Sequence, residues 1–260
     1  MYDVFQTEKL IDLWLTEDIG YCDLTAQLMI DQDTMGTFHM NAREPMHVAG
    51  IDVAARVFCK YDAQLKVTRF VKDGDKVEKG TRLLTVTGPA RSILTAERTA
   101  LNISQRLCGI ATETARYNAE IAGTKTRLID SRKTTPGLRM LEKHVVVCGG
   151  GLNHRLGLDN GVMLKDNHID YAGGLAPALQ RTKAYLESKK LNLRVEVEVR
   201  SEAELKELLS LPQDYHRIML DNCTPEALKV ALTLIPSTVE TEASGGITEE
   251  TIRSYAETGV

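Results

Sequence analysis

Residues 191–243 read LNLRVEVEVRSEAELKELLSLPQDYHRIMLDNCTPEALKVALTLIPSTVETEA, and this stretch decides the fold. Three short apolar segments, 193–199, 216–222 and 237–243, alternate with two segments of helical periodicity, 201–211 and 224–235. Short strands that alternate with helices of this length form a parallel sheet covered by helices. We therefore predict an α/β fold for this part of the chain.

The same alternation starts farther upstream, with strands at 126–131 and 162–167 and helices at 139–149 and 173–190. Polar or charged residues end nearly every strand: Asp130 to Lys133, Lys165 to His168, Glu198, Asp221 with Asn222, and Ser244 to Gly246. In an α/β barrel, these strand ends line the face that carries the active site. Because five strands are too few to close a barrel, we expect the last strand to lie beyond Val260.

The first part of the chain has a different pattern. Residues 8–20 have the spacing of an amphipathic helix followed by a glycine, and residues 37–87 contain short β-rich runs separated by turn signals. Residues 93–121 have apolar residues at helical spacing and predict one long helix or two abutting helices. We predict an N-terminal domain with an antiparallel sheet and a linking helix over residues 1–112, and a barrel domain over residues 113–260.

Composition excludes several classes of protein. The chain has 260 residues, of which 43% are hydrophobic, and its formal net charge is -4. This charge gives no reason to expect nucleic acid or an anionic membrane as a partner. No apolar run approaches the roughly 20 residues that span a bilayer, and the first residues do not resemble a secretion signal. We therefore expect a soluble, cytoplasmic protein.

The five cysteines are Cys22, Cys59, Cys108, Cys148 and Cys223. Their number is odd and none forms a CxxC pair, so the sequence indicates neither a disulfide framework nor a zinc site. Glycines follow Cys148, but no neighbour in the sequence marks it as an activated nucleophile. We expect reduced, mostly buried thiols.

The densest polar signal is DSRKTTPGLR, residues 130–139. Arg132 and Lys133 lie beside two threonines, and a Pro-Gly turn follows them. A planar Arg fork and a Lys point charge on one loop suit carboxylate or phosphate oxygens. Taken alone, the pair is also compatible with a solvated basic loop.

Two further motifs add cations at the ends of predicted elements. CGGGLNHR, residues 148–155, has three consecutive glycines before His154 and Arg155, and VMLKDNHI, residues 162–169, puts Lys165 at the end of a strand. Each residue alone is compatible with a structural role. If all of these cations share one rim of the barrel, they form a cationic pocket that needs a polyanionic ligand.

Carboxylates and glycines complete the candidate site. Side chains alternate along a strand, so Glu196 and Glu198 face the barrel interior, and Glu198 lies nearer the mouth. Glu198 and Asp221, on adjacent strands, can hold magnesium directly or indirectly or accept hydrogen bonds from ribose hydroxyls, although they could also merely neutralise the cations. EASGGI, residues 242–247, predicts a phosphate-binding turn before a helix that Thr248 caps.

The chain resembles the quinolinate phosphoribosyltransferase family from about Leu15 to its last residue. The resemblance rests on LTEDIGYCDLTAQL, DGDKVEKG, ERTALN, DSRKTTPGLRMLEKHVVVCGGGLNHRLGL, LKDNHI, EVEV, LDN and EASGGI. It implies an N-terminal α/β sandwich beside an incompletely closed, seven-stranded α/β barrel. It also implies transfer of a phosphoribosyl group from phosphoribosyl pyrophosphate to quinolinate, with release of carbon dioxide and pyrophosphate, in de novo NAD biosynthesis.

The resemblance also assigns roles to residues. Residues Arg132, His154, Arg155 and Lys165 match positions around the two carboxylates of quinolinate. Lys133 matches a catalytic position between quinolinate and the phosphoribosyl group, and Glu198 and Asp221 match catalytic residues that contact the ribose and magnesium. Ser244, Gly245 and Gly246 match the 5′-phosphate loop. Arg98 matches an arginine that reaches the partner subunit's site, which implies a homodimer or a larger ring of dimers.

Two alternatives stay open at this point. A related phosphoribosyltransferase could act on another aromatic acid, or a catalytically idle barrel could serve as a binding partner. The motif LKDNHI and the full set of cations favour quinolinate over another acid. The complete set of polar strand ends argues against an idle barrel.

Overall fold

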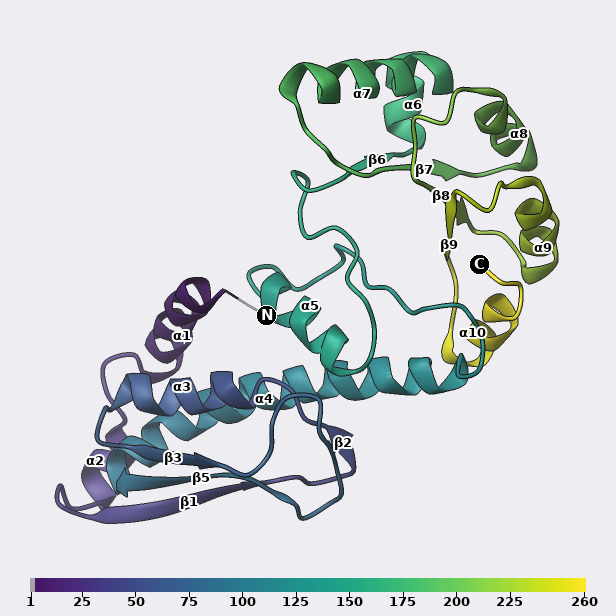
Figure 1. The fold of residues 1–260 in the computed structure, drawn as a ribbon. Helices are drawn as coiled ribbons and strands as arrows, with labels where there is room; N and C mark the ends of the chain where they lie inside the picture. Colours follow the sequence, from purple (N-terminus) through teal and green to yellow (C-terminus); the bar gives the residue numbers. More distant parts are fainter. Residues whose placement is uncertain (1–2) are drawn as a thin grey trace. The chain divides into compact units, whose positions relative to one another are not determined.

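The computed structural model describes residues 3–260, which form two compact units (Figure 1). The N-terminal unit extends to Asn118 and includes Leu128–His154. The C-terminal unit consists of Ala119–Arg127 and Arg155–Val260. Each unit has a hydrophobic core of its own. The domain boundary between residues 112 and 113 stays a prediction.

Two helices open the N-terminal unit. Helix α1 spans Val4–Ile19, begins where the Asp3 carboxylate accepts two backbone N–H groups, and ends at Gly20 with a positive φ of 58°. Its residues Ile11 and Leu15 are buried in the core, which confirms the predicted amphipathic helix. Helix α2, Leu24–Met29, was not predicted.

The predicted antiparallel sheet is confirmed. Its strands are β1 Met35–Asn41, β2 Met46–His47, β3 Lys66–Arg69, β4 Lys76–Val77 and β5 Arg82–Pro89. Strands β1, β5 and β3 form one antiparallel sheet in that order, and β2 pairs with β4. The turn signals lie between strands that are consecutive in the chain, but β4 pairs with β2 and with neither β3 nor β5, so these turns do not close hairpins.

Helix α3, Ile51–Tyr61, lies in a region where the β-rich sequence pattern predicts strands only. Its buried residues include Ile51, Ala54 and Phe58, which have the 3–4 spacing of a helix face. The N–H of Ile51 donates to Asp73 Oδ1 at 3.0 Å, so a carboxylate from a distant loop caps the helix. A cap that comes from another segment leaves no signal in the local sequence.

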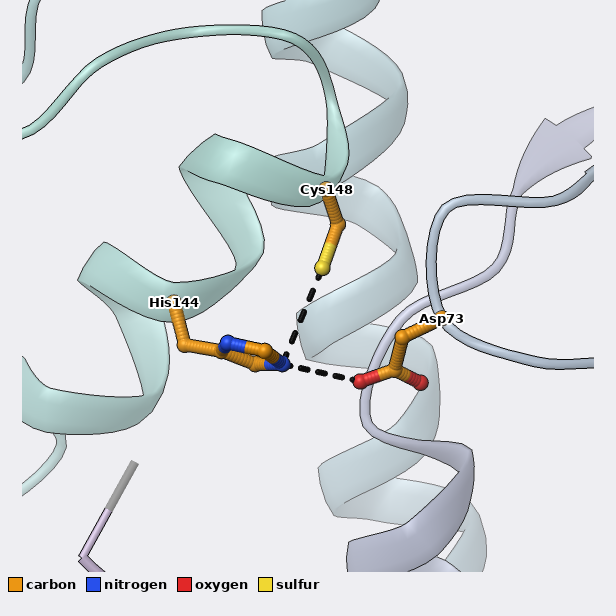
Figure 2. Close-up of side chains that lie close together, drawn as sticks. All are labelled: Asp73, His144 and Cys148. Carbon is orange, nitrogen blue, oxygen red and sulfur yellow. Dashed lines mark hydrogen bonds and ion pairs between the residues drawn. The ribbon is translucent and has the colours of Figure 1, made fainter. Parts of the chain in front are cut away.

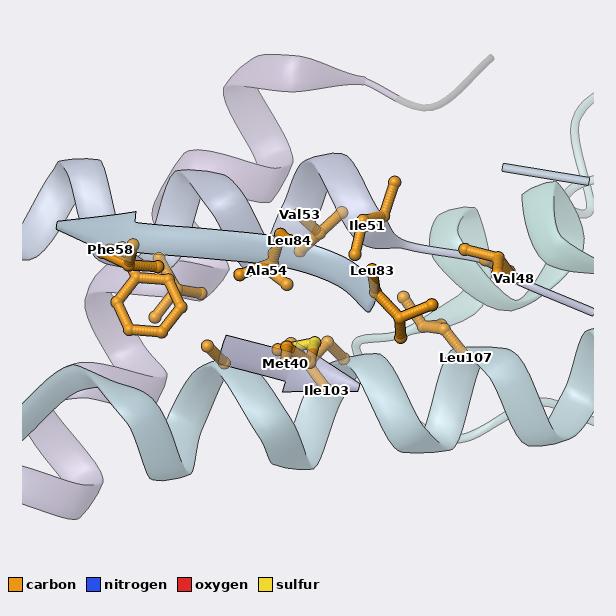
Figure 3. Close-up of a cluster of buried hydrophobic side chains, with 14 of the residues drawn as sticks. Met40, Val48, Ile51, Val53, Ala54, Phe58, Leu83, Leu84, Ile103 and Leu107 are labelled. Atoms are coloured by element: carbon orange, nitrogen blue, oxygen red, sulfur yellow. The ribbon is translucent and has the colours of Figure 1, made fainter. Parts of the chain in front are cut away.

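Helix α4, Ala90–Glu120, is a single helix of 31 residues, which is one of the two predicted possibilities. Side chains from α3, β1, β5 and α4 pack together in the core of the N-terminal unit (Figure 3). The rings of Phe38 and Phe58 lie 5.8 Å apart at this contact. Burial of each such large side chain stabilises the fold by about 1.5–3 kcal/mol.

The segment after α4 differs from the prediction. Helix α5, Arg139–Cys148, forms as expected, but the strand expected at 126–131 is wrong. Only Ile129 pairs, with Leu152, in an isolated parallel bridge. The apolar run is two residues long, and the next residue, Asp130, turns its carboxylate to side-chain and backbone donors in the same unit. The ladder therefore ends after one bridge.

The C-terminal unit has the predicted βα alternation. Its elements are β6 Val162–Leu164, α6 Asp166–Ala172, α7 Leu175–Lys189, β7 Val195–Val199, α8 Glu202–Ser210, β8 Arg217–Asp221, α9 Pro225–Leu234, β9 Glu240–Ser244 and α10 Glu249–Ala256. The four strands form a parallel sheet in the order β6-β7-β8-β9, and within the described residues this sheet does not close into a barrel. Helix α6 was not predicted.

Alternation along β7 follows the sequence pattern. Val195, Val197 and Val199 belong to the hydrophobic core of this unit, together with residues of α7, α8 and α9. Glu196 and Glu198 occupy the other positions of the strand, and both are buried. The valines therefore fix the register that sends both carboxylates to the opposite face of the sheet.

Two glycines on the N-terminal unit should respond to alanine in opposite directions. A Cβ on Gly149 would lie 2.6 Å from Thr114 Cβ and would also collide with the Ala111 carbonyl, whereas a Cβ on Gly109, inside α4, meets nothing within 4 Å. We expect Gly149→Ala to lower the free energy of unfolding by about 1–3 kcal/mol. Gly109→Ala should raise it by about 0.5–1 kcal/mol. Urea unfolding measures both, and equal effects would contradict the packing described.

Candidate active site

The loop of residues 130–139 carries the first two predicted site residues. Within the described part of the chain, Nε of Arg132 is buried and has no hydrogen-bond partner. Lys133 is exposed, and its backbone N–H donates to Ser131 Oγ at 3.1 Å. A buried guanidinium N–H without an acceptor is costly, so this geometry suits an anionic ligand that supplies one.

Glu142 fixes the loop, although no sequence motif marks it as a site residue. Its Oε2 accepts the Thr135 N–H at 3.0 Å, and its Oε1 accepts Arg106 Nε at 3.0 Å. Burial raises the pKa of Glu142, but the hydrogen bonds from Thr135 and Arg106 lower it more, so the net pKa lies below its usual value. The carboxylate therefore stays charged and holds the loop against α4 and α5.

His154 is positioned through its backbone. The N–H of His154 donates to Asp130 Oδ1 at 2.8 Å, and its carbonyl accepts Lys143 Nζ at 3.1 Å. Lys143 also forms an ion pair with Asp130, and its side chain is 1% exposed. The preceding glycine run lets the chain turn, because Gly150 has a φ of 88°.

Lys165 and Glu198 meet in the C-terminal unit. Lys165 follows β6 directly, and its ammonium forms an ion pair with Glu198 on the neighbouring strand β7. Glu196 instead lies 3.9 Å from Arg217 Nη1, and Arg217 also donates to Glu242. The two carboxylates of β7 therefore have different partners, and Glu198 is the one that pairs with a predicted ligand-binding cation.

Arg155 lies in the same unit and has a structural contact. Its Nη1 donates to the Gly161 carbonyl at 2.9 Å. This bond draws the chain between Arg155 and β6 into a closed loop, so the guanidinium is held close to the start of that strand. The side chain is half-buried.

Asp221 and the SGGI turn form one hydrogen-bonded group. Ser244 Oγ donates to Asp221 Oδ1 at 2.6 Å, and the Asn222 N–H donates to the Ser244 carbonyl at 2.8 Å. A Cβ on Gly245 would lie 2.7 Å from Asn222 Cγ, so only glycine fits there. Among the described residues, the N–H groups of Gly245 and Gly246 donate to no protein acceptor. This arrangement can receive phosphate oxygens.

The remaining predicted residues are Arg98 and Thr248. Arg98 lies on α4 and is exposed. Thr248 is the N-cap residue of α10, as predicted, and its N–H donates to Thr251 Oγ1 at 2.9 Å. The structure thus places Arg98, Arg132, Lys133 and His154 in the N-terminal unit. The other predicted site residues lie in the C-terminal unit.

The expectation of mostly buried thiols is wrong. All five cysteines are free, but only Cys108 is buried, while Cys22, Cys148 and Cys223 are half-buried and Cys59 is exposed. The cysteines lie at the ends of helices and in loops as well as in the core, so the apolar character of a thiol did not predict its burial. Cys148 also has neighbours that the sequence did not reveal, because they come from another segment and from the previous turn of α5.

Comparisons with known proteins agree on one family. The models for the N-terminal and C-terminal domains of quinolinate phosphoribosyl transferase match residues 23–108 and 110–260. The chain is 41% identical to quinolinate phosphoribosyltransferase (decarboxylating) 2a, mitochondrial, of Nicotiana tabacum over 273 residues, covering 100% of this chain and 77% of that protein.

Two further comparisons give the same result. The chain is 40% identical to nicotinate-nucleotide pyrophosphorylase (carboxylating), chloroplastic, of Arabidopsis thaliana, covering 100% of this chain and 78% of that protein. The structure of nicotinate-nucleotide pyrophosphorylase from Francisella tularensis matches with a TM-score of 0.93 and 38% identity, covering 100% of this chain and 90% of that one. None of the helices within residues 3–260 is long and apolar enough to cross a membrane.

Glu142 provides a test of the loop that carries Arg132. Because the pKa of Glu142 is depressed in the folded state, its stabilisation is present above the unfolded pKa and is lost as pH falls through the folded pKa. We expect Glu142→Gln to lower the free energy of unfolding by about 1–3 kcal/mol at neutral pH and to reduce the acid-dependent loss of stability. Urea unfolding across the acid range measures this. The exposed Glu113→Gln is the control and should leave the profile unchanged.

Proposed function

We propose that this chain, which belongs to the quinolinate phosphoribosyltransferase family, binds quinolinate and phosphoribosyl pyrophosphate with the residues described above. The family membership gives the reaction: transfer of the phosphoribosyl group to quinolinate with decarboxylation, which yields nicotinate mononucleotide, carbon dioxide and pyrophosphate in NAD biosynthesis. What we propose is the assignment of individual residues to this reaction.

Arg132 carries the assignment of the quinolinate site. Its buried Nε needs an acceptor, and quinolinate offers two adjacent carboxylates. His154, Arg155 and Lys165 supply further positive or polar groups in a chain whose net charge is -4. Lys133, exposed on the same loop as Arg132, is the catalytic cation that we assign to the region between the two substrates. Local positive charge in an acidic chain attracts and orients these anions.

The C-terminal unit carries the assignment of the phosphoribosyl site. Ser244, Gly245 and Gly246 form the turn that we assign to the 5′-phosphate, because two N–H groups and a helix N-terminus are available there. Asp221, joined to Ser244 by a hydrogen bond of 2.6 Å, is assigned to the ribose hydroxyls together with Glu198. Both carboxylates also stabilise positive charge that develops on the ribose.

The chemistry divides into two steps. First, the bond from ribose C1′ to pyrophosphate breaks, pyrophosphate leaves with the electron pair, and the quinolinate ring nitrogen forms the new bond to C1′. The protein holds the nitrogen in line with C1′ and neutralises the departing charge. The bond to the adjacent carboxyl group then breaks, carbon dioxide leaves, and the electron pair left on the ring carbon is stabilised by the quaternised nitrogen until a proton arrives.

We also propose magnesium as the metal ion of this site. The donor set fits, since Glu198 and Asp221 supply carboxylate oxygens and magnesium commonly uses one or two carboxylates with waters and substrate phosphates. When bound, the ion neutralises charge on pyrophosphate. The ion pair between Lys165 and Glu198 has to rearrange if Glu198 binds the ion directly.

The functional unit that we propose is a homodimer or a larger assembly of dimers. The family resemblance supports this, because it matches Arg98, an exposed cation on α4, to an arginine that reaches the partner subunit's site. We also propose a cytoplasmic location. The five free cysteines agree with a reducing compartment, although the Nicotiana and Arabidopsis relatives carry mitochondrial and chloroplastic in their names.

The direct test is an assay of the purified chain with quinolinate, phosphoribosyl pyrophosphate and magnesium, with nicotinate as a parallel substrate. We expect nicotinate mononucleotide from quinolinate alone. In the same assay and by calorimetry, Arg132→Ala should lose quinolinate binding by about 100-fold or more, as loss of a bidentate charged contact predicts, while phosphoribosyl pyrophosphate still binds.

The control for this variant is Arg116→Ala, an exposed arginine of α4 that pairs with Glu113. It should bind both substrates as the unaltered chain does. Normal binding of both substrates by Arg132→Ala would show that the assigned quinolinate site is wrong.

Mixing two inactive variants tests the role of Arg98. If Arg98 completes the partner subunit's site, then Arg98→Ala and Lys133→Ala are each inactive, yet mixed dimers have one complete site. After equal amounts are mixed and allowed to exchange subunits, we expect about one quarter of the full rate, because half of the dimers are mixed and half of their sites are complete. No recovery in mixtures shown to exchange would exclude a shared site.

A further inference from the structure

A cluster of three potential metal ligands lies in the N-terminal unit, among residues that the proposed reaction does not use. Asp73 comes from the loop between β3 and β4, and His144 and Cys148 come from successive turns of α5 (Figure 2). His144 Nε2 lies 3.0 Å from Asp73 Oδ2 and 3.7 Å from Cys148 Sγ. The three ligand atoms all lie within 4.8 Å of one another.

These distances match those between ligands of a tetrahedral zinc ion. Zinc bonds of about 2.0 Å to nitrogen and oxygen and about 2.3 Å to sulfur place tetrahedral nitrogen and oxygen ligands about 3.3 Å apart, and nitrogen and sulfur about 3.6 Å apart. The observed separations of 3.0 Å and 3.7 Å differ from these values by a few tenths of an ångström. Small side-chain movements are therefore enough to admit the ion.

The scaffold of the cluster holds the ligands in place. Asp73 Oδ1 accepts the Ile51 N–H at 3.0 Å, which caps α3 and leaves Oδ2 directed at His144. His144 and Cys148 are four residues apart on one helix, a spacing that brings two ligands to the same face. In metal sites of proteins, the oxygen of a ligating carboxylate that does not face the ion is typically hydrogen-bonded in this way, as Asp73 Oδ1 is to the Ile51 N–H.

The surroundings also favour a cation with an open coordination position. The Asp73 carboxylate lies 3.0 Å from His144 Nε2 and supplies negative charge beside the cluster. The side chains of His144 and Asp73 are 19% and 18% exposed, so water can reach the cluster. Three protein ligands and one water complete a four-coordinate zinc site.

We propose that Asp73, His144 and Cys148 bind one zinc ion, with water as the fourth ligand. A set of sulfur, nitrogen and oxygen donors selects zinc over magnesium or calcium, which prefer oxygen alone. The ion joins the β3–β4 loop to the end of α5, from which the glycine run leads to His154. Its effect is on the stability of the N-terminal unit, and the reaction proceeds without it.

Cobalt binding to the full chain tests the site, because tetrahedral cobalt(II) takes the place of zinc and absorbs visible light. After removal of metal with a chelator, we expect one equivalent of cobalt to give a visible band and a thiolate-to-cobalt charge-transfer band in the near ultraviolet. One equivalent of zinc should abolish both bands. Zinc should also raise the melting temperature of the unaltered chain, because it binds the folded state.

Ligand variants and matched thiol controls make the test specific. Asp73→Asn, His144→Gln and Cys148→Ala should each weaken cobalt binding by more than about 100-fold, since loss of a mere supporting contact costs 10–100-fold. Cys148→Ala should also lose the charge-transfer band. The Asp73→Asn side chain keeps an Oδ1 acceptor for the Ile51 N–H, so it tests the ligand with the α3 cap preserved.

Cys59→Ala and Cys223→Ala are the controls and should leave both bands intact. Cys223 is the informative one, because its Sγ lies 3.7 Å from the Asp221 carbonyl, next to the site proposed for magnesium. Loss of the charge-transfer band in Cys223→Ala, its persistence in Cys148→Ala, or its absence from the unaltered chain would each overturn the proposal. None of these measurements depends on catalytic activity, so the zinc site and the proposed function can fail separately.

Discussion

The buried ion pair between Lys143 and Asp130 is the interaction on which the geometry of the candidate ligand-binding residues in the N-terminal unit depends. The Lys143 side chain is 1% exposed, and the pair holds both backbone groups of His154. Removal of one partner from such a pair costs about 3–5 kcal/mol, because the other charge stays buried without compensation. The pair also lies at the start of the loop with Arg132, so two candidate ligand-binding residues share one anchor.

The C-terminal unit compensates its carboxylates with contacts of other kinds. Its carboxylates already have partners, since Lys165 pairs with Glu198 and the Ser244 hydroxyl donates to Asp221. In the proposed assignment, substrates and magnesium have to displace these contacts inside the protein. Such an exchange keeps the carboxylates charged and oriented before the ligands arrive, which is the preorganisation that stabilises charge in a transition state. In that assignment, Lys165 becomes available to a substrate carboxylate once Glu198 contacts the ribose or the ion.

The spacing of apolar residues predicted those elements whose pattern fits only one type of secondary structure. The valines of VEVEV predicted the parallel sheet, and the apolar stripe of α4 predicted one long helix or two abutting helices, of which the structure has the single helix. It failed where the decisive contact is distant in sequence: α3 is capped by Asp73, and the expected strand at 126–131 is limited to one bridge because Asp130 bonds to Lys143 and His154. Motif resemblance supplied the candidate ligand-binding residues, but Glu142, which orders their loop, has no local signal.

Helix α5 shows why the sequence could not indicate the cluster that includes Cys148. Glu142 and Lys143 face the loop of Arg132 and the backbone of His154, whereas His144 contacts both Asp73 and Cys148. The ten residues of the helix therefore include both the contacts that order the Arg132 loop and two residues of the candidate metal site, and only the fold brings Asp73 to them. Zinc at a free concentration 100 times its dissociation constant would raise the free energy of unfolding by about 2.7 kcal/mol. That amount is comparable to the cost of losing the Glu142 contacts, so zinc and Glu142 would stabilise opposite ends of the same helix with similar strength.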